Sequence, residues 1–225
     1  MIAAALVLVA GYLLGSIPSS ILVGKLIRGR RFDIREHGSG NAGATNVART
    51  LGLRPAFCVL LFDGGKGAAA AALPLTAWVQ SRTSVDPLTL SLLAGLAAVL
   101  GHAFPLFAGF RGGKGVGTTA GFLLVLFPTA VLACVATWIV VLLLTGYVSV
   151  SSLIASAALP LALWLDPRRA SATVIVVAIA AALLILWLHR GNLRRLMQGT
   201  ENRFDRARLF RRPAENEVGQ GRTPP

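Results

Sequence analysis

The chain has 225 residues, of which 55% are hydrophobic and only 14% are charged, a composition outside the range of soluble globular domains. Its net charge of +13 lies in basic clusters beside apolar runs, which favours anionic lipid headgroups as partners and argues against nucleic acid. The apolar runs are continuous rather than alternating, which argues against β-barrel strands. At ~20 helical residues per span, they predict an all-α polytopic membrane protein.

The first predicted span covers residues 2–24, which hold no charge. This stretch has no basic segment before it and, at about 23 residues, is too long for the apolar part of a signal peptide. A polar, glycine-rich loop at 28–52 follows it. We expect a second span at 55–78, with residues 63–67 inside it, and a third at 87–107.

The next part of the chain, residues 115–165, carries no charge in 51 positions. Its length alone would favour two spans. An odd number is needed, however, if Lys114 and the C-terminus share the cytoplasmic face while the loop at 166–170 lies outside. The helix breakers in this part of the chain therefore predict three short spans, near 114–127, 129–145 and 148–165.

The basic residues indicate the orientation in the membrane. Seven lie between Lys25 and Arg54, nine lie between Arg190 and Arg222, and the other charged loops are poorer in them. The positive-inside rule places both basic segments in the cytoplasm. With a last span at 172–188, this gives seven transmembrane helices, an outside N-terminus and a cytoplasmic C-terminus. One long irregular span in the uncharged block would instead give five.

The chain is expected to form one transmembrane domain over residues 1–203. Residues 204–225 form a basic tail that holds proline and glutamate without apolar periodicity, so disorder is expected there. Cys58 and Cys134 lie in apolar stretches with no CxxC partner, which predicts core or lipid-facing thiols and no disulfide or redox pair.

Two glycine-glycine-lysine-glycine segments, at 62–67 and 110–115, interrupt the apolar sequence. Glycine and lysine are both costly there, unless backbone N–H groups and an ammonium close around an anion such as phosphate. Neither segment has the spacing of a nucleotide P-loop. In the second segment, anion binding is predicted for Lys114 with its neighbours Gly112, Gly113 and Gly115. In the first, Asp63 and Lys66 either lock helix packing as an ion pair or contact substrate.

Polar side chains gather in the loop at 38–49 and around the exit of the last span. In the loop, donors and a phosphate-binding guanidinium are expected from Ser39, Asn41, Thr45, Asn46 and Arg49. After the last span, His189 and Asn192 share one helical face, and Glu201 follows. His102 has either a packing role or a catalytic one.

Several kinds of chemistry find no support in the sequence. There is no HExxH, no G-x-S-x-G and no His/Cys/carboxylate cluster with metal-ligand spacing. The acyltransferase arrangement of histidine followed four residues later by aspartate is also missing. Neither a metal, nor a cofactor, nor a covalent intermediate is therefore expected.

Five motifs together resemble the bacterial acyl-phosphate:glycerol-3-phosphate acyltransferase family. They are GSGNAGATN with Arg49, DGGKG at 63–67, GHAFPLFAGFRGGKGVGT at 101–118, YVSVSS at 147–152 and HRGNLRRLMQGTEN at 189–202. The match runs in order from residue 1 to about residue 203. It implies an enzyme of the bacterial plasma (inner) membrane, with its active site facing the cytoplasm, that makes 1-acyl-glycerol 3-phosphate in the first step of phospholipid synthesis.

The resemblance also implies substrates and roles. The partners would be acyl phosphate, glycerol 3-phosphate and membrane lipid, and no protein partner is indicated. The resemblance places Ser39 and Arg49 at the reacting centre, Lys114 and its glycines on phosphate, and Ser149 and Ser152 near the acyl phosphate. It places His189, Asn192 and Glu201 near glycerol phosphate. A phosphate-ester transporter and a lipid-binding scaffold remain as alternatives, since glycine-broken helices and an intramembrane ion pair also suit a transporter.

Overall fold

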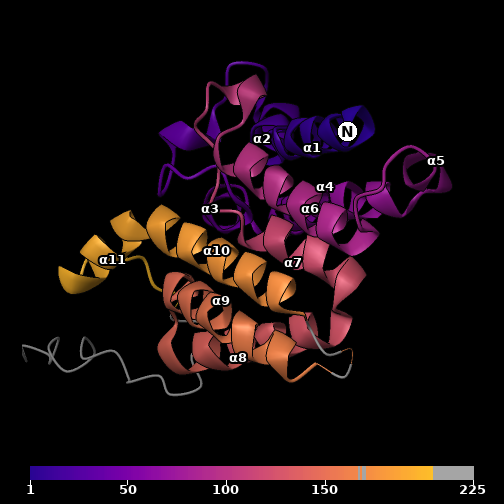
Figure 1. The fold of residues 1–225 in the computed structure, drawn as a ribbon. Coiled ribbons are helices and arrows are strands. Elements are labelled where there is room, and N and C mark those ends of the chain that lie inside the picture. The colour runs from indigo at the N-terminus through magenta and orange to yellow at the C-terminus, as the bar shows by residue number, and fades with distance from the viewer. Residues whose placement is uncertain (167, 169–170, 205–225) are drawn as a thin grey trace, which may run out of the picture.

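The computed structural model describes residues 1–166, 168 and 171–204, and within these ranges all regular structure is helical (Figure 1). Most of the predicted tail, residues 205–225, and part of the loop at 166–170 lie outside the described residues. The all-α prediction is confirmed for the described part of the chain.

The first predicted span is not one continuous helix. α1 (Ile2–Gly15) ends before Pro18, and α2 (Ser19–Arg28) begins after it. Proline has no N–H to donate and disfavours helical backbone in the residue before it, which explains the break. The predicted span at 2–24 is therefore present as two helical segments joined at a proline. At the break, the carbonyl of Ile17 accepts from the N–H of Ser19 at 3.0 Å and from Lys66 Nζ of a neighbouring helix at 3.1 Å.

The loop after α2 is folded around a small apolar cluster. It contains the short 3-10 helix η1 (Ile34–Glu36) and the helix α3 (Ala44–Thr50). Ile34 and Val47 are fully buried, and they pack with residues of α2 and of the following helix. The cluster fixes the loop against the helix bundle, so its polar residues have defined positions.

The helix α4 (Leu53–Ala72) continues into η2 (Leu73–Leu75) and is followed by α5 (Ala77–Gln80). The first glycine-rich segment is helical within α4. A methyl group on Gly67 would collide with the backbone of Thr118, and one on Gly121 with that of Gly64. These glycines let α4 pack closely on α7 (Val116–Leu126). Of the two alternatives for this segment, helix packing is therefore the one that these contacts support.

The remaining helices follow the predicted ranges closely. They are α6 (Pro87–Ala103), η3 (Leu106–Ala108), α8 (Pro128–Thr145), α9 (Val148–Trp164), α10 (Ala172–Leu188) and α11 (Arg190–Met197). Pro160 lies inside α9 without ending it. Proline at the first position of α8 and glycine after its last residue explain the boundaries of that helix.

The helices form two groups that lie side by side (Figure 1). The helices α1, α4, α6 and α7 make one group, and α8, α9 and α10 make the other. A core that includes the fully buried Phe122 and Leu163 joins them where α7 contacts α8 and α6 contacts α10. Many large apolar side chains remain exposed on the outside, as expected for a surface that faces lipid.

Among the described residues, four helical segments are long and apolar enough to cross a membrane: Ile2–Arg28, Leu53–Leu75, Pro87–Ala108 and Pro128–Thr145. The pair α10 and α11, which is bent by 53°, would make a fifth. The helices α7 and α9 are apolar but shorter. The chain thus has the features of a multi-pass membrane protein.

Candidate active site

A cavity of about 400 Å³ opens between the two groups of helices. One side of it is polar and the other apolar. Most of the residues predicted for a site line this cavity, from loops and helices far apart in the sequence: Ser39, Asn41, Thr45, Arg49, Asp63, His102, Lys114, Gly115, Ser149, Ser152, His189, Asn192 and Glu201.

A hydrogen-bonded chain crosses the polar side. Lys114 Nζ donates to Asn192 Oδ1, and Asn192 Nδ2 donates to Glu201 Oε1 at 2.6 Å. Arg195 Nε donates to the other oxygen of Glu201 at 2.8 Å. Glu201 is buried, because the chain turns back toward the bundle after α11. Arg195 was not singled out from the sequence, where nothing distinguishes it from Arg194.

The protonation of this chain follows from burial and charge. Burial lowers the pKa of the Lys114 ammonium to about 8, although the carboxylate of Glu201 opposes the shift. Burial disfavours the charged form of Glu201, but hydrogen bonds from Asn192 and Arg195 outweigh it and lower the pKa of that carboxyl. Near neutral pH the polar side therefore holds a protonated lysine beside an ionised glutamate.

His189 lies at the junction of α10 and α11 with a defined tautomer. Its Nδ1 is 2.8 Å from the carbonyl oxygen of Ile185, which can only accept. Nδ1 therefore carries the proton, and Nε2 of the neutral ring keeps a lone pair. The side chain is buried and borders the cavity, so it can accept a hydrogen bond from a hydroxyl group there.

The second glycine-rich segment is a loop, as predicted, but two of its glycines do not present N–H groups to the cavity. The N–H of Gly112 donates to the carbonyl of Ala103, and that of Gly113 donates to the carbonyl of His102. Both glycines instead allow close packing, since a methyl group on either would collide with α6 or its side chains. Their expected role as N–H donors to phosphate is corrected accordingly.

Gly115 differs from these two glycines, because it lines the cavity. Its φ of 78° is in the left-handed region that glycine tolerates, and it is the N-cap of α7. It lines the cavity with Val116 and Gly117, in the first turn of α7, where a helix has N–H groups without helical partners. Lys114 and the positive end of α7 therefore face the same polar space.

Asn46 does not line the cavity. It is fully buried, and its amide group holds the preceding loop by accepting from the N–H of Ser39 at 2.8 Å. It also donates to the carbonyls of Ile34 at 3.0 Å and His37 at 2.9 Å. Its predicted role in substrate binding is therefore corrected to a structural one, whereas Asn41 does reach the cavity.

Arg49 extends from α3 to the cavity, and its guanidinium lies 4.9 Å from the centre of the Phe204 ring. The N–H of Phe204 donates to the carbonyl of Gly146 at 2.8 Å. Phe204, the last described residue, thus packs against the rest of the chain.

Arg35 is a second residue that the sequence did not single out. It forms an ion pair with Asp33 at 2.7 Å and donates to the carbonyl of Ala108 at 2.7 Å. It also donates to the carbonyl of Arg111 at 3.2 Å. It connects the loop at 28–52 to the loop that carries Lys114.

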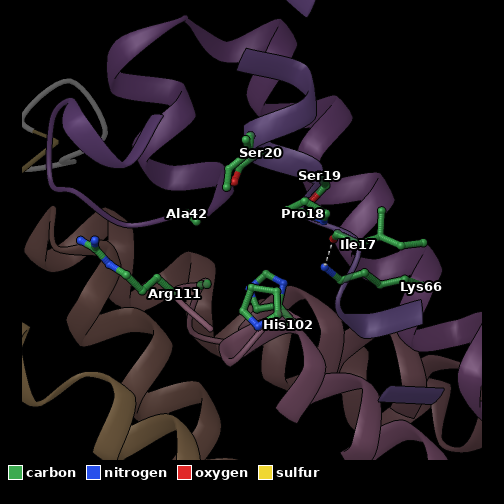
Figure 2. Close-up of a pocket in the computed structure, with 12 residues that line it drawn as sticks. Ile17, Pro18, Ser19, Ser20, Ala42, Lys66, His102 and Arg111 are labelled. Atoms are coloured by element: carbon green, nitrogen blue, oxygen red, sulfur yellow. Dashed lines mark hydrogen bonds between the residues drawn. The ribbon is translucent and has the colours of Figure 1, made fainter. Parts of the chain in front are cut away.

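The predicted ion pair of Asp63 and Lys66 is confirmed at 2.9 Å, and it is buried. Ser19 and His102 also contact this carboxylate, which the sequence did not indicate. Lys66 donates to the carbonyl of Ile17 at 3.1 Å, as Figure 2 shows, and does not line the large cavity. These contacts support the packing alternative for Lys66.

The apolar side of the cavity lies between α7, α8 and α9. It is lined mainly by Leu123, Val131, Cys134, Val135, Trp138, Ile139, Ala155, Leu159 and Ile185. Trp138 donates to the hydroxyl of Ser152 at 3.2 Å, where the polar and apolar sides meet. Cys134 is a cavity-lining thiol, and Cys58 is exposed on the outside of α4. Among the described residues, no group of three histidines, cysteines or carboxylates could hold a metal ion.

The comparisons with known proteins agree with one another. The sequence profile described as glycerol-3-phosphate acyltransferase matches residues 5–199. The glycerol-3-phosphate acyltransferase of Chlorobaculum parvum is 38% identical over 223 residues, which cover 88% of this chain and 95% of the relative. That of a Synechococcus species is 42% identical over 208 residues, which cover 91% and 96%.

Two crystal structures of PlsY (YgiH), described as an integral membrane glycerol 3-phosphate acyltransferase, share this fold. The glycerol 3-phosphate form has a TM-score of 0.79 at 36% identity and covers 89% of this chain and 95% of that chain. The lysophosphatidic acid form has a TM-score of 0.76 at 36% identity, with coverages of 89% and 94%.

Proposed function

The chain belongs to the glycerol-3-phosphate acyltransferase family, and we propose that it transfers a fatty acyl group from acyl phosphate to the 1-hydroxyl of glycerol 3-phosphate. The products are 1-acyl-glycerol 3-phosphate and inorganic phosphate. The single observation that carries this proposal is the cavity, in which a cationic polar side continues into an apolar side between helices. An acyl phosphate has these same two parts.

The polar side suits two phosphate groups. Lys114, Arg49 and the positive end of α7 surround it, and they can neutralise the repulsion between the phosphates of donor and acceptor. The structures of PlsY with glycerol 3-phosphate and with lysophosphatidic acid support an acceptor and a lipid product of this kind. The apolar side would hold the acyl chain.

The reaction needs no nucleophilic side chain, because the acyl phosphate is already activated. The 1-hydroxyl oxygen of glycerol 3-phosphate attacks the acyl carbonyl carbon, the carbon–oxygen bond to phosphate breaks, and the departing phosphate takes the hydroxyl proton. Nε2 of His189 would accept the hydroxyl hydrogen bond and orient the attack. Positioning and charge stabilisation then supply the acceleration.

Seven crossings of the membrane are part of the same proposal. The apolar helical segments, with α1 and α2 counted as one, alternate in direction along the chain. Figure 1 shows α2, α3 and α11 at one end of the bundle and α5 at the other. The basic residues of α2 and α11 fall at the same end, which supports a cytoplasmic active site in the plasma membrane and an outside N-terminus.

Cysteine labelling tests this topology in a background without Cys58 and Cys134. An impermeant reagent should label a cysteine that replaces the exposed Thr129 only from outside, and one that replaces the exposed Arg111 only from the cytoplasm. If the position of Thr129 were protected from both sides, the five-span alternative would be supported.

The decisive activity experiment uses the purified full chain with acyl phosphate and glycerol 3-phosphate. Release of inorganic phosphate that depends on both substrates, with formation of the acylated product, is expected. If glycerol 3-phosphate instead crossed the membrane of proteoliposomes that contain the protein, chemically unchanged and without release of phosphate, the transporter alternative would replace this proposal.

A further inference from the structure

Behind the polar side of the cavity, one carboxylate oxygen collects three donors. Asp63 Oδ1 lies 2.5 Å from Ser19 Oγ, 2.9 Å from Lys66 Nζ and 3.3 Å from His102 Nδ1. The four residues come from α2, α4 and α6, and all are buried. We call Asp63, Lys66, His102 and Ser19 the buried quartet.

Stability alone does not account for the buried quartet. Removing a carboxylate and an ammonium from water costs several kcal/mol per ion, and well-packed apolar residues often stabilise a core as well or better. Another explanation is that such a group holds the neighbouring segments of the chain in a single conformation. The neighbours of the buried quartet show which conformation that is.

His102 connects the buried quartet to the loop that carries Lys114. The carbonyls of His102 and Ala103 accept the N–H groups of Gly113 and Gly112, both at 3.1 Å. A methyl group on Gly113 would collide with Nε2 of His102, so the glycine rests directly on the imidazole ring. Lys114 is the next residue. A rotation of the ring would displace the turn from which Lys114 reaches the cavity.

The bond to Asp63 prevents that rotation. Because the carboxylate oxygen accepts, Nδ1 of His102 carries the proton and the ring is fixed with Nε2 toward Gly113. Lys66 and Ser19 in turn hold the carboxylate, and Lys66 is anchored on the carbonyl of Ile17 at the break between α1 and α2. Figure 2 shows the His102 ring lying between Lys66 and Arg111.

We propose that the buried quartet is a positioning device for Lys114: it fixes the His102 ring as a support for Gly112 and Gly113 and thereby sets the place of the Lys114 ammonium. This inference rests on the proposed function for its kinetic consequence only. His102 and Asp63 border the cavity, but they act through the loop, and they are positioning residues rather than catalytic ones.

Two substitutions at His102 test this device. His102→Leu removes the Nδ1–H donor and replaces the imidazole by a side chain of similar size. His102→Asn keeps an N–H close to the position of Nδ1. In the full-length protein, we expect His102→Leu to lower kcat/KM by ~10-fold or more, through a lower kcat as well as a higher KM for glycerol 3-phosphate. His102→Asn should recover part of this loss, because it keeps the donor to Asp63 but not the ring atoms next to Gly113. Ser91→Ala is the control, because Ser91 is also buried on α6 but lies outside the buried quartet.

Hydrogen exchange supplies a readout that does not depend on catalysis. His102→Leu should speed amide exchange in residues 109–115 by ~10-fold or more, while exchange in α8 and α9 stays as in the unchanged protein. Ser19→Ala, which removes a single donor, should give a smaller increase confined to the same loop. This second variant keeps the test valid if the leucine variant does not fold.

Three results would overturn the inference. Loss of activity in His102→Leu with normal amide exchange in residues 109–115 would mean direct contact of His102 with substrate. Faster exchange throughout the protein in both His102→Leu and Ser19→Ala, or unchanged exchange in both variants, would also contradict it. If the unchanged enzyme released no phosphate from its substrates, the proposed function would fail. The exchange experiment would still decide whether the buried quartet holds the loop.

Discussion

The ammonium of Lys114 donates a hydrogen bond to the side-chain oxygen of Asn192, although 78 positions separate the two residues in the chain. This bond joins the loop before α7 to the helix α11. Asn192 is itself held by Glu201, so the lysine meets an acceptor that is already fixed in place. The ammonium is thereby oriented before any substrate arrives, which is the arrangement that electrostatic catalysis requires.

Lys114→Ala should lower turnover by ~30-fold to ~1000-fold. Loss of one charge-assisted phosphate contact costs ~2–4 kcal/mol of transition-state stabilisation. Phosphate release by equal amounts of membrane-inserted protein measures the effect. Lys25→Ala is a matched control, because Lys25 is exposed at the end of α2. A variant with half of the normal turnover would contradict the role given to Lys114.

The affinity for glycerol 3-phosphate should fall as the pH rises through 8. A bound phosphate dianion favours the charged form of Lys114, whose pKa burial lowers to about 8. Below that pH the charge is present, and above it binding must take up a proton, so Kd should rise by up to ~10-fold per pH unit. The second pKa of a phosphate ester is ~6, so the ligand itself does not change charge in this range.

The measurement is calorimetric titration between pH 6.5 and 9.5, with Lys114→Arg as the comparison. Arginine stays charged throughout, so its Kd should be flat above pH 8 if it still binds. An equal rise in both proteins would assign the pH dependence to another group.

The helix ranges could be predicted well because each is marked by an apolar run between helix breakers. The range 172–188 is a clear case, with Ser171 capping its first turn. The break after Gly15 could not be predicted in the same way, since the apolar run continues through Pro18. Length and hydropathy do not distinguish a straight helix from two segments joined at a proline.

The residues of the site could be predicted, but the hydrogen bonds between them could not. Asn41 and Asn46 lie in the same loop and have the same side chain, yet one lines the cavity and the other holds backbone. Which role each takes depends on the burial of Ile34 and Val47 beside Asn46, a tertiary effect. For the same reason, the glycines before Lys114 could be read as N–H donors, although their N–H groups are bonded to α6.

Asn46→Ala should destabilise the loop at 28–52 and lower activity without touching the substrate. It removes the acceptor of the Ser39 N–H and one of the two donors to each of the carbonyls of Ile34 and His37. An unpaired buried donor costs ~1–3 kcal/mol. Proteolysis should then cut near Ser39 faster than in the unchanged protein. Asn41→Ala is the comparison: it should reduce activity without faster cleavage. Faster cleavage in both variants, or in neither, would contradict the separate roles.

The apolar side of the cavity should set the length of acyl chain that the enzyme accepts. Along α9, Ser152, Ala155 and Leu159 face the cavity in turn, and they lie at increasing distances from its polar side. Because a helix rises ~1.5 Å per residue, Leu159 lies ~10 Å beyond Ser152 along the axis. A phenylalanine at either apolar position would fill space that a long chain needs.

Ala155→Phe should therefore exclude long and medium chains, whereas Leu159→Phe should exclude only long ones. The measurement is kcat/KM for a series of acyl phosphates of increasing length, with the ratio of long to short donors as the readout. We expect this ratio to fall by ~10-fold or more in both variants. When the apolar side of the cavity is blocked, the end of a long acyl chain no longer contacts apolar side chains. Leu161→Phe is the control, since Leu161 is exposed on the outer side of the same helix. If all three variants kept the normal chain-length profile, the acyl chain would have to lie elsewhere, and the assignment of the apolar side would be wrong.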